Sequence, residues 1–236
     1  MTATFQLSMY AGTSRFSEKT LRYAIQQCLH KVETTLELYP DNLEVEVYGD
    51  RHQWRDNHTL LSEEGLFTWV LGDCGRIIRV VAEEEKVRSD RSLARVVCHE
   101  CVHHVIHHHT GQNIPAWLDE GLAIHFTQEL PRRYLETLVE ALRSDTFLPL
   151  EFLEQPFTRL DRTMKNLAYG QAVTLVVFLV TRYGYVFVRA MLDDCKRGDR
   201  WERTLRRQAL TLYLLEKEWQ RWLEGWLCER LLPGED

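Results

Sequence analysis

The chain has 236 residues, of which 44% are hydrophobic and 27% are charged. This composition is typical of a globular protein, and it excludes disorder over most of the chain because the apolar residues can offset chain entropy. The formal net charge of −6 argues against nucleic acid as the main partner, since phosphate-binding surfaces are usually basic.

The sequence carries no pattern typical of export or membrane insertion. Its first residues lack a basic region followed by an apolar block, so we expect no secretory signal. The longest uncharged run, residues 166–181, is shorter than the ~20 residues that cross a bilayer. The six cysteines are scattered, which predicts reduced thiols rather than a disulfide scaffold. We therefore expect a cytoplasmic protein with no membrane partner.

The first 88 residues are predicted to form an α+β lobe. A helix is expected over residues 17–38, with Ser17 as its N-cap, because apolar residues recur there at helical spacing. Three segments have the composition of strands, namely residues 43–48, 65–70 and 76–81. The last two are joined by the turn-rich residues 72–75, so we expect a small sheet with an antiparallel edge.

From residue 90 onward the pattern of apolar residues is helical. The first helix is predicted over residues 92–110, where Gly111 ends it, and the second runs from Pro115 to about residue 129. Further helices are expected at residues 131–143, 164–183, 185–195, 200–209 and 212–231. Residues 168–180 are apolar on nearly every side, which favours a buried core helix over a membrane segment.

The sequence His99-Glu100-Cys101-Val102-His103 is an H-E-x-x-H motif on the first of these helices. Residues four apart lie on one face of a helix, so the two imidazoles can reach a single Zn²⁺ at ~2.0–2.1 Å. Glu100 lies to one side, where it can take a proton from a water on the metal. The motif alone does not exclude a histidine-rich surface helix that binds no metal. The prediction of a metal site therefore depends on a third ligand.

Glu120 is the candidate third ligand. It follows His103 by 17 positions and lies on the helix that begins at Pro115, which can fold back against the first helix. Two histidines and one glutamate leave the fourth tetrahedral position for water, as catalytic zinc sites do. Gly121 would allow a close approach between helices. The alternative is that Glu120 is a solvated helix residue that binds no metal and only lies next to residues of the core.

These segments together resemble the gluzincin metallopeptidases, in particular the short bacterial peptidase MA-like group related to thermolysin and aminopeptidase N. The resemblance covers about residues 76–225. It rests on the H-E-x-x-H motif, on Trp117-Leu118-x-Glu120-Gly121-x-Ala123, and on two later segments at residues 169–184 and 215–222. It implies a thermolysin-like fold in which one zinc ion per chain is bound by His99, His103 and Glu120, with Glu100 as general base and acid. It also implies that residues 75–81 form an edge strand that pairs with an extended peptide.

The resemblance also suggests an oxyanion donor and shows two departures. In related enzymes a tyrosine from a later helix donates a hydrogen bond to the oxyanion, and Tyr169 is the best match, with a core tyrosine as the alternative. Ile124 stands where thermolysin-like enzymes have an aspartate that supports a histidine, and Asp119 is the nearest substitute. The Gly-x-Met-Glu-Asn segment of aminopeptidases is absent, which argues against aminopeptidase specificity.

The cysteines and the other histidines of this helix are expected to lie outside the metal site. Cys98 and Cys101 point away from the face that carries the motif histidines, so buried structural thiols are favoured over redox or metal roles. His107 continues the ligand face one turn further on. The remaining histidines are expected to be solvated or half-buried: His104, His108 and His109.

We therefore expect a zinc-dependent hydrolase, a metalloprotease that cleaves a peptide or protein through a metal-activated water. A single catalytic domain, residues 1–236, is predicted, comprising the α+β lobe (1–88), the zinc-binding helices (89–129) and a helical lobe (130–236). Two alternatives remain: a non-catalytic zinc-binding regulatory or interaction protein on the same fold, and a docking module in which the motif is accidental. Glu100 argues against the first, because a structural zinc site does not need it.

Overall fold

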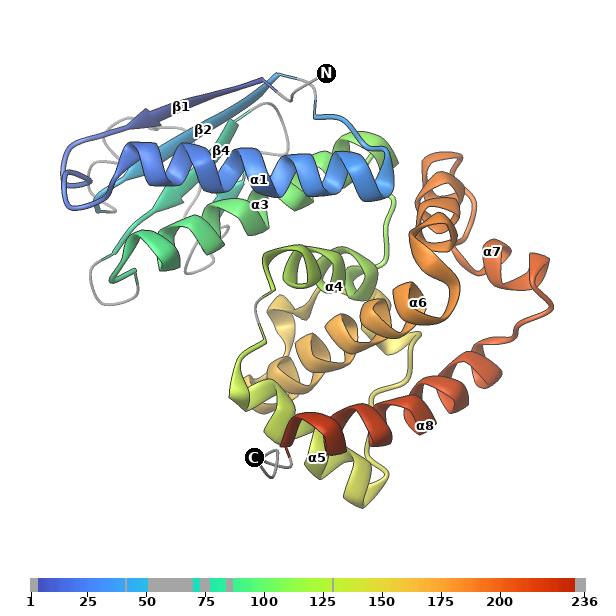
Figure 1. Ribbon diagram of the computed structural model, residues 1–236. Coiled ribbons are helices and arrows are strands. Elements are labelled where there is room, and N and C mark those ends of the chain that lie inside the picture. The colour runs from blue at the N-terminus through green and yellow to red at the C-terminus, as the bar shows by residue number, and fades with distance from the viewer. Residues whose placement is uncertain are drawn as a thin grey trace. The chain divides into compact units, whose positions relative to one another are not determined.

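The computed structural model describes residues 4–40, 42–50, 70–72, 77–83, 87–128 and 130–231. It divides into two compact units, Met1–His108 and His109–Asp236. The first unit contains strands and helices, whereas the described part of the second contains helices and turns (Figure 1). The α+β class expected from the sequence is therefore confirmed.

A small sheet forms the centre of the first unit, with the strand order β1-β2-β4-β3. Three of its strands, β1 (Phe5–Met9), β2 (Leu43–Tyr48) and β4 (Ile77–Val81), run parallel. Only the short β3 (Val70–Gly72) pairs in the antiparallel sense, with β4. The expectation of an antiparallel-edged sheet is therefore not supported, because the principal strands of this sheet are parallel. The predicted strand at 65–70 lies outside the described residues except for its last residue.

β4 lies between β2 and β3 rather than at an edge of the sheet. The expectation that residues 75–81 form the edge strand for an extended peptide is wrong, because β4 is hydrogen-bonded to a neighbour on both sides. Among the described strands, the two edges are β1 and β3. Any strand added to this described sheet would have to pair with one of those two.

Two helices, α1 (Glu18–Leu36) and α3 (Asp90–Thr110), lie along the same face of the sheet (Figure 1). α1 begins after the predicted N-cap Ser17, whose Oγ accepts a hydrogen bond from the Thr20 backbone N–H at 3.2 Å. The Ser17 backbone N–H in turn donates to Asp90 Oδ1 at 3.0 Å, which joins the start of α1 to the start of α3. α1 also connects β1 to β2, and such a helical crossover is what makes two successive strands parallel.

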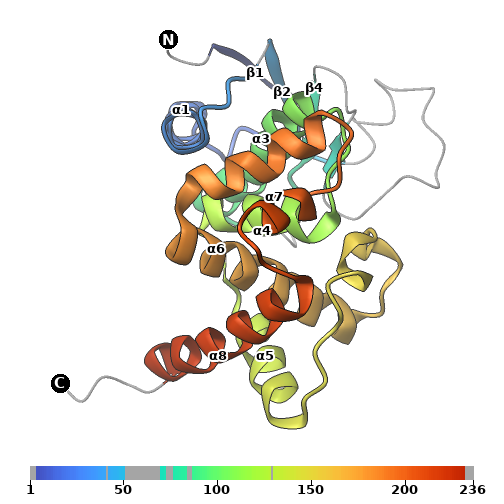
Figure 2. The same cartoon turned by 90° about the vertical axis from the view of Figure 1, so that its right-hand side faces the viewer.

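The second unit is organised around the long helix α6 (Arg162–Lys196), which contacts several other α-helices of the described part of the chain (Figure 2). These helices are α4 (Ala116–Thr127), α5 (Arg132–Ser144), α7 (Glu202–Arg207) and α8 (Leu212–Leu231). Gly184 interrupts α6 with φ 79° and ψ 169°, a conformation that glycine adopts readily. The break confirms the two helices predicted at residues 164–183 and 185–195.

By length and composition α6 could also cross a membrane. Within the second unit, however, 44% of its most apolar stretch is buried, and α4, α5, α7 and α8 pack against it. Such contacts are typical of a buried core helix, which is the interpretation that the sequence favours.

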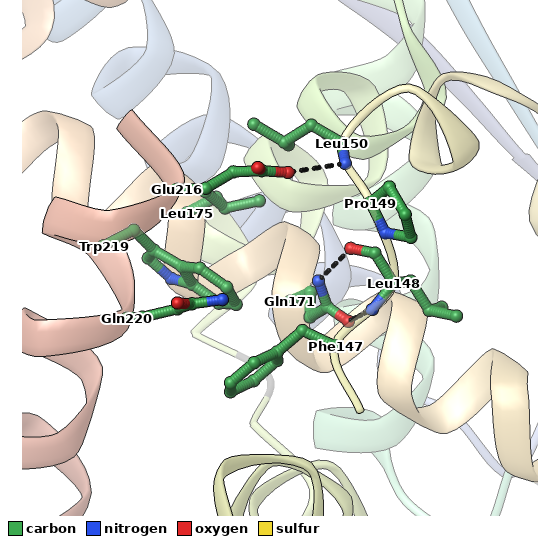
Figure 3. A pocket seen from close by; sticks show the side chains of 9 residues that line it. All are labelled: Phe147, Leu148, Pro149, Leu150, Gln171, Leu175, Glu216, Trp219 and Gln220. Carbon is green, nitrogen blue, oxygen red and sulfur yellow. Dashed lines mark hydrogen bonds between the residues drawn. The ribbon is translucent and has the colours of Figure 1, made fainter. Parts of the chain in front are cut away.

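A strap at residues 147–150 is held against α6 and α8 by side-chain hydrogen bonds (Figure 3). Gln171, which is 1% exposed, accepts from the Leu148 backbone N–H at 2.8 Å and donates to the Leu148 carbonyl at 2.9 Å. Glu216 Oε1 accepts from the Leu150 backbone N–H at 3.0 Å. The strap and α8 enclose a pocket of about 140 Å³. Because Gln171 satisfies both backbone groups of Leu148, the strap is fixed to α6.

Asp194 joins the end of α6 to α7. Its side chain is fully buried and accepts hydrogen bonds from Thr204 Oγ1 at 2.5 Å, from both Nη atoms of Arg207 at 2.9 and 3.2 Å, and from Arg197. Burial alone would raise the pKa of the Asp194 carboxyl, but the hydrogen bonds from Thr204, Arg197 and Arg207 outweigh it and lower that pKa below its ordinary value of 3.8.

The Asp194→Ala variant should lose about 2–3 kcal/mol of unfolding free energy at pH 7, measured by urea denaturation. Because the folded-state pKa is lowered, this contribution is present above the ordinary pKa and is lost as the pH falls through the folded value. The difference between the two proteins should therefore shrink below about pH 4. Glu224→Ala, at an exposed position of α8, is the control and should change stability little at either pH. An equal loss at pH 3 and pH 7 would contradict the assigned charge interaction.

Candidate metal centre

The H-E-x-x-H motif lies in the middle of α3, in the first unit, as predicted. One side of α3 is buried, through residues that include Val97, Val102 and Ile106. The motif residues His99, Glu100 and His103 are half-buried instead. The helix is therefore anchored by its apolar side, while the motif side chains remain accessible.

The two motif histidines point at one another. His99 Nε2 and His103 Nε2 are 3.0 Å apart, and their rings meet edge to face with centroids separated by 4.7 Å. Two nitrogens at this separation can both lie ~2.0–2.1 Å from one ion, the distance that zinc prefers. The nitrogens and a carboxylate oxygen of Glu100 all lie within 4.8 Å of one another. These side chains thus fit a zinc ion, with a carboxylate beside the position that the two nitrogens would share.

Glu120 lies on α4 in the second unit and is half-buried. Its neighbour Gly121 faces α6 so closely that a Cβ would lie 2.4 Å from the Ala172 carbonyl oxygen and 2.7 Å from Val176 Cγ2. The predicted close approach between helices at Gly121 is therefore confirmed, and its partner is α6. This contact fixes the stretch of α4 that carries Glu120.

Tyr169 lies on α6 and packs beside the same part of α4. Ile124, one turn after Glu120, forms a buried cluster with Tyr134 and Val173, and Tyr169 packs against this cluster. The Tyr169 ring stacks on Tyr134 with centroids 5.7 Å apart. Position 124 is thus a core position, which accounts for an apolar residue where thermolysin-like enzymes have an aspartate.

The structure brings three of the predicted site residues together, namely His99, Glu100 and His103. Glu120 and Tyr169 belong to the second unit, so their meeting with the two imidazoles stays a prediction.

The sequence model of the Peptidase MA superfamily matches residues 76–225 of the chain. The chain belongs to the Peptidase MA superfamily. This is the clan of gluzincin-type metallopeptidases that the motif and its flanking segments resemble. No curated protein matches the chain. Membership supports a metallopeptidase-like fold and a peptide or protein as substrate.

The two cysteines within the superfamily motif region are buried thiols, as predicted. Cys98 is 6% exposed and Cys101 is fully buried, both on the apolar side of α3. Burial raises the pKa of the Cys101 thiol well above its ordinary value. Its full burial on the apolar side of α3, away from the face that carries the motif histidines, makes Cys101 a core group.

The additional histidines fall into different environments. His107 lies one turn beyond His103, with ring centroids 5.7 Å apart, and so continues the ligand face. His108 is exposed. His109 belongs to the second unit, where its Nε2 lies 2.8 Å from Asp193 Oδ1. Burial lowers the pKa of His109 despite that carboxylate, which favours a neutral, structural imidazole.

A histidine–tyrosine pair in the second unit was not predicted. His125 Nε2 on α4 lies 2.7 Å from the Tyr185 hydroxyl on α6, just beyond the break at Gly184. Burial raises the pKa of Tyr185. The two residues are 60 positions apart on different helices, so no local pattern could have indicated the pair. It joins α4 to the second half of α6.

The Gly121→Ala variant tests the close packing of α4 on α6. Because the added Cβ would meet the Ala172 backbone and the short, branched side chain of Val176, we expect a loss of about 1–3 kcal/mol in unfolding free energy. Gly225→Ala is the matched control, since a Cβ there meets nothing within 4 Å and α8 should gain about 0.5–1 kcal/mol. Thermal or urea unfolding measures both, and equal effects of the two substitutions would contradict this packing.

Proposed function

We propose that the protein is a zinc-dependent metallopeptidase in which His99, His103 and Glu120 bind one zinc ion and Glu100 is the general base. The observation that carries the proposal is the 3.0 Å approach of the two imidazole nitrogens, with the Glu100 carboxylate beside them. It occurs in a chain of the Peptidase MA superfamily. Two imidazoles and one carboxylate form a donor set that catalytic zinc uses.

In the proposed reaction, water adds to the scissile carbonyl and the C–N bond then breaks. A bound Zn²⁺ would supply a Lewis acid for the carbonyl and lower the pKa of the water toward ~7. Glu100 takes a proton from the attacking water and returns it to the leaving amine nitrogen. The Tyr169 hydroxyl donates a hydrogen bond to the oxyanion, which stabilises the negative charge that develops there.

Zinc content and peptide hydrolysis test the proposal directly. The purified chain should contain about one zinc ion and should cleave an unstructured polypeptide such as casein, with loss of activity on treatment with a chelator and recovery on addition of zinc. A chain that takes up no zinc would exclude the proposal. A chain that binds zinc but cleaves no peptide would favour the alternative function, a zinc-binding regulatory or interaction protein.

The Tyr169→Phe variant tests the oxyanion donor. Removal of one donor should lower kcat by about 10²–10³-fold with little change in KM or zinc content, because the donor acts only in the transition state. Tyr134→Phe is the matched control, since Tyr134 stacks on Tyr169 and the substitution keeps the ring. Equal losses of kcat in the two variants would assign Tyr169 to packing alone.

A further inference from the structure

The pocket behind the strap lies in the second unit, between segments that are far apart in the sequence (Figure 3). The strap forms one wall, and α6 and α8 form the others. The protein itself holds these walls in place, because Gln171 bonds both backbone groups of Leu148 and Glu216 accepts from the Leu150 backbone N–H. None of the described residues that line the pocket belongs to the proposed zinc and catalytic set.

Glu216 gives the pocket its charge. It is half-buried, and it is the only charged side chain among the described residues that line the pocket. Its Oε1 accepts one hydrogen bond, from the Leu150 backbone N–H at 3.0 Å, and no lysine or arginine of the described chain forms an ion pair with it. A carboxylate can accept about four hydrogen bonds, so Glu216 has capacity for further donors. Buried charges in proteins are usually paired, and this carboxylate therefore favours a cation from outside the chain.

The remainder of the lining favours the same kind of ligand. Both polar ends of the Gln171 amide bond the strap, and Gln220 Oε1 accepts from Lys217 Nζ at 3.1 Å. The rings of Phe147 and Trp219 also line the pocket, and they meet edge to face with centroids 5.0 Å apart. Aromatic rings attract a cation that lies within about 6 Å of the ring centroid. The carboxylate and the two rings thus provide complementary attraction for a positive charge.

We propose that this pocket binds an alkylammonium group, either of a small free amine or of a lysine side chain. A cavity of about 150 Å³ can hold a benzene-sized molecule, so a volume of about 140 Å³ has room for a butylammonium group. The ammonium donates to Glu216, and the alkyl chain contacts the apolar wall that includes Leu175. A guanidinium fits less well, since its strongest geometry uses both carboxylate oxygens and Oε1 already accepts from the Leu150 N–H.

Titration of the full ¹⁵N-labelled chain with n-butylammonium chloride at low ionic strength tests the proposal. The indole N–H signal of Trp219, assigned with the Trp219→Phe variant, reports on the pocket because this ring forms part of its wall. We expect a saturable shift of that signal. 1-Butanol is the matched control ligand, since it has nearly the same shape but no charge, and it should bind about 10–100-fold more weakly. These measurements need neither zinc nor peptide cleavage, so failure of the proposed peptidase function would leave their result unaffected.

The Glu216→Gln variant should bind butylammonium about 10–100-fold more weakly and 1-butanol with unchanged affinity. The amide oxygen can still accept from the Leu150 N–H, so the substitution removes the charge and keeps the strap in place. Glu224→Gln, at an exposed position of the same helix, is the matched control and should bind both ligands as the unmodified chain does. Phe147→Leu provides a second test should Glu216→Gln fold poorly. It replaces a ring by an apolar side chain and should weaken butylammonium binding by about 2–5-fold.

Nα-acetyl-lysine methylamide distinguishes the two sources of the ammonium group. Binding as tight as that of butylammonium, or tighter, would support the proposal and assign the pocket to a lysine side chain of a peptide or protein. Binding of butylammonium alone would support it and assign the pocket to a free amine. The proposal would be overturned by the lack of a saturable shift, by equal affinities for butylammonium and 1-butanol, or by an unchanged affinity of the Glu216→Gln variant.

Discussion

The Glu100→Gln variant is expected to lose peptidase activity by about 10²–10⁴-fold in kcat while it retains about one zinc ion per chain. Glutamine has nearly the same shape as glutamate but cannot accept the proton of the attacking water. The two imidazoles that face each other at 3.0 Å are unchanged in the variant, so the metal should still bind. Activity is measured on an unstructured polypeptide, and zinc is measured by elemental analysis of the same preparation.

Glu18→Gln is the matched control for this experiment. Glu18 is an exposed residue at the start of α1, where it pairs with Arg22 at 2.7 Å, and its substitution should leave zinc content and activity unchanged. A Glu100 carboxylate oxygen lies close to both ring nitrogens, so loss of zinc from the Glu100→Gln variant would identify Glu100 as a ligand instead. Full activity with full zinc content would exclude Glu100 as the base.

The helices could be predicted from the sequence because their signals are local. Ser17 caps α1 through the Thr20 backbone N–H, and Gly111 follows the last residue of α3 with a positive φ of 63°. Gly184 marks the break in α6 that separates the two predicted helices. In each case a residue and its neighbours within one or two turns determine the boundary, so the surrounding fold is not needed to find it.

The sheet could be predicted only in part, because strand pairing is not local. The alternation in residues 43–48 identified β2, but β1 was not predicted. β1 has five residues, and its position in the sheet depends on pairing with β2, which follows it by a whole helix. The interior position of β4 likewise depends on its pairing with β3. The edge-strand expectation failed for this reason.

The candidate site could also be predicted where it depends on local spacing, but not where it depends on packing between helices. The approach of His99 to His103 follows from their spacing of four on one helix, so the motif predicted it. Gly121 indicated a close helix contact, but only the folded second unit identifies α6 as the helix that fills it. From the sequence, Tyr169 could be selected only through the family resemblance. No local pattern indicates its position near Ile124, because that position depends on how α6 packs on α4.

The Glu120→Gln variant should bind zinc about 100-fold more weakly than the unmodified chain, or more weakly still, and should lose activity in proportion. An amide carries no charge and is a poorer zinc ligand than a carboxylate, so two imidazoles alone would have to hold the ion. Glu120 is half-buried on a helix that Gly121 fixes against α6, and the substitution is nearly isosteric, so the fold should persist. Zinc affinity is measured by competition with a chromogenic chelator, and circular dichroism checks the fold.

Glu140→Gln, at an exposed position of α5 in the same unit, is the matched control and should bind zinc with unchanged affinity. The comparison with Glu100→Gln then assigns the two carboxylates. If Glu120 is the third ligand and Glu100 the base, Glu120→Gln weakens zinc binding and Glu100→Gln does not. The reverse pattern would make the local set His99, Glu100 and His103 the metal site, in which Glu100 is occupied as a ligand and no longer serves as the base. That result would contradict the proposed peptidase mechanism, because its proton acceptor would be missing.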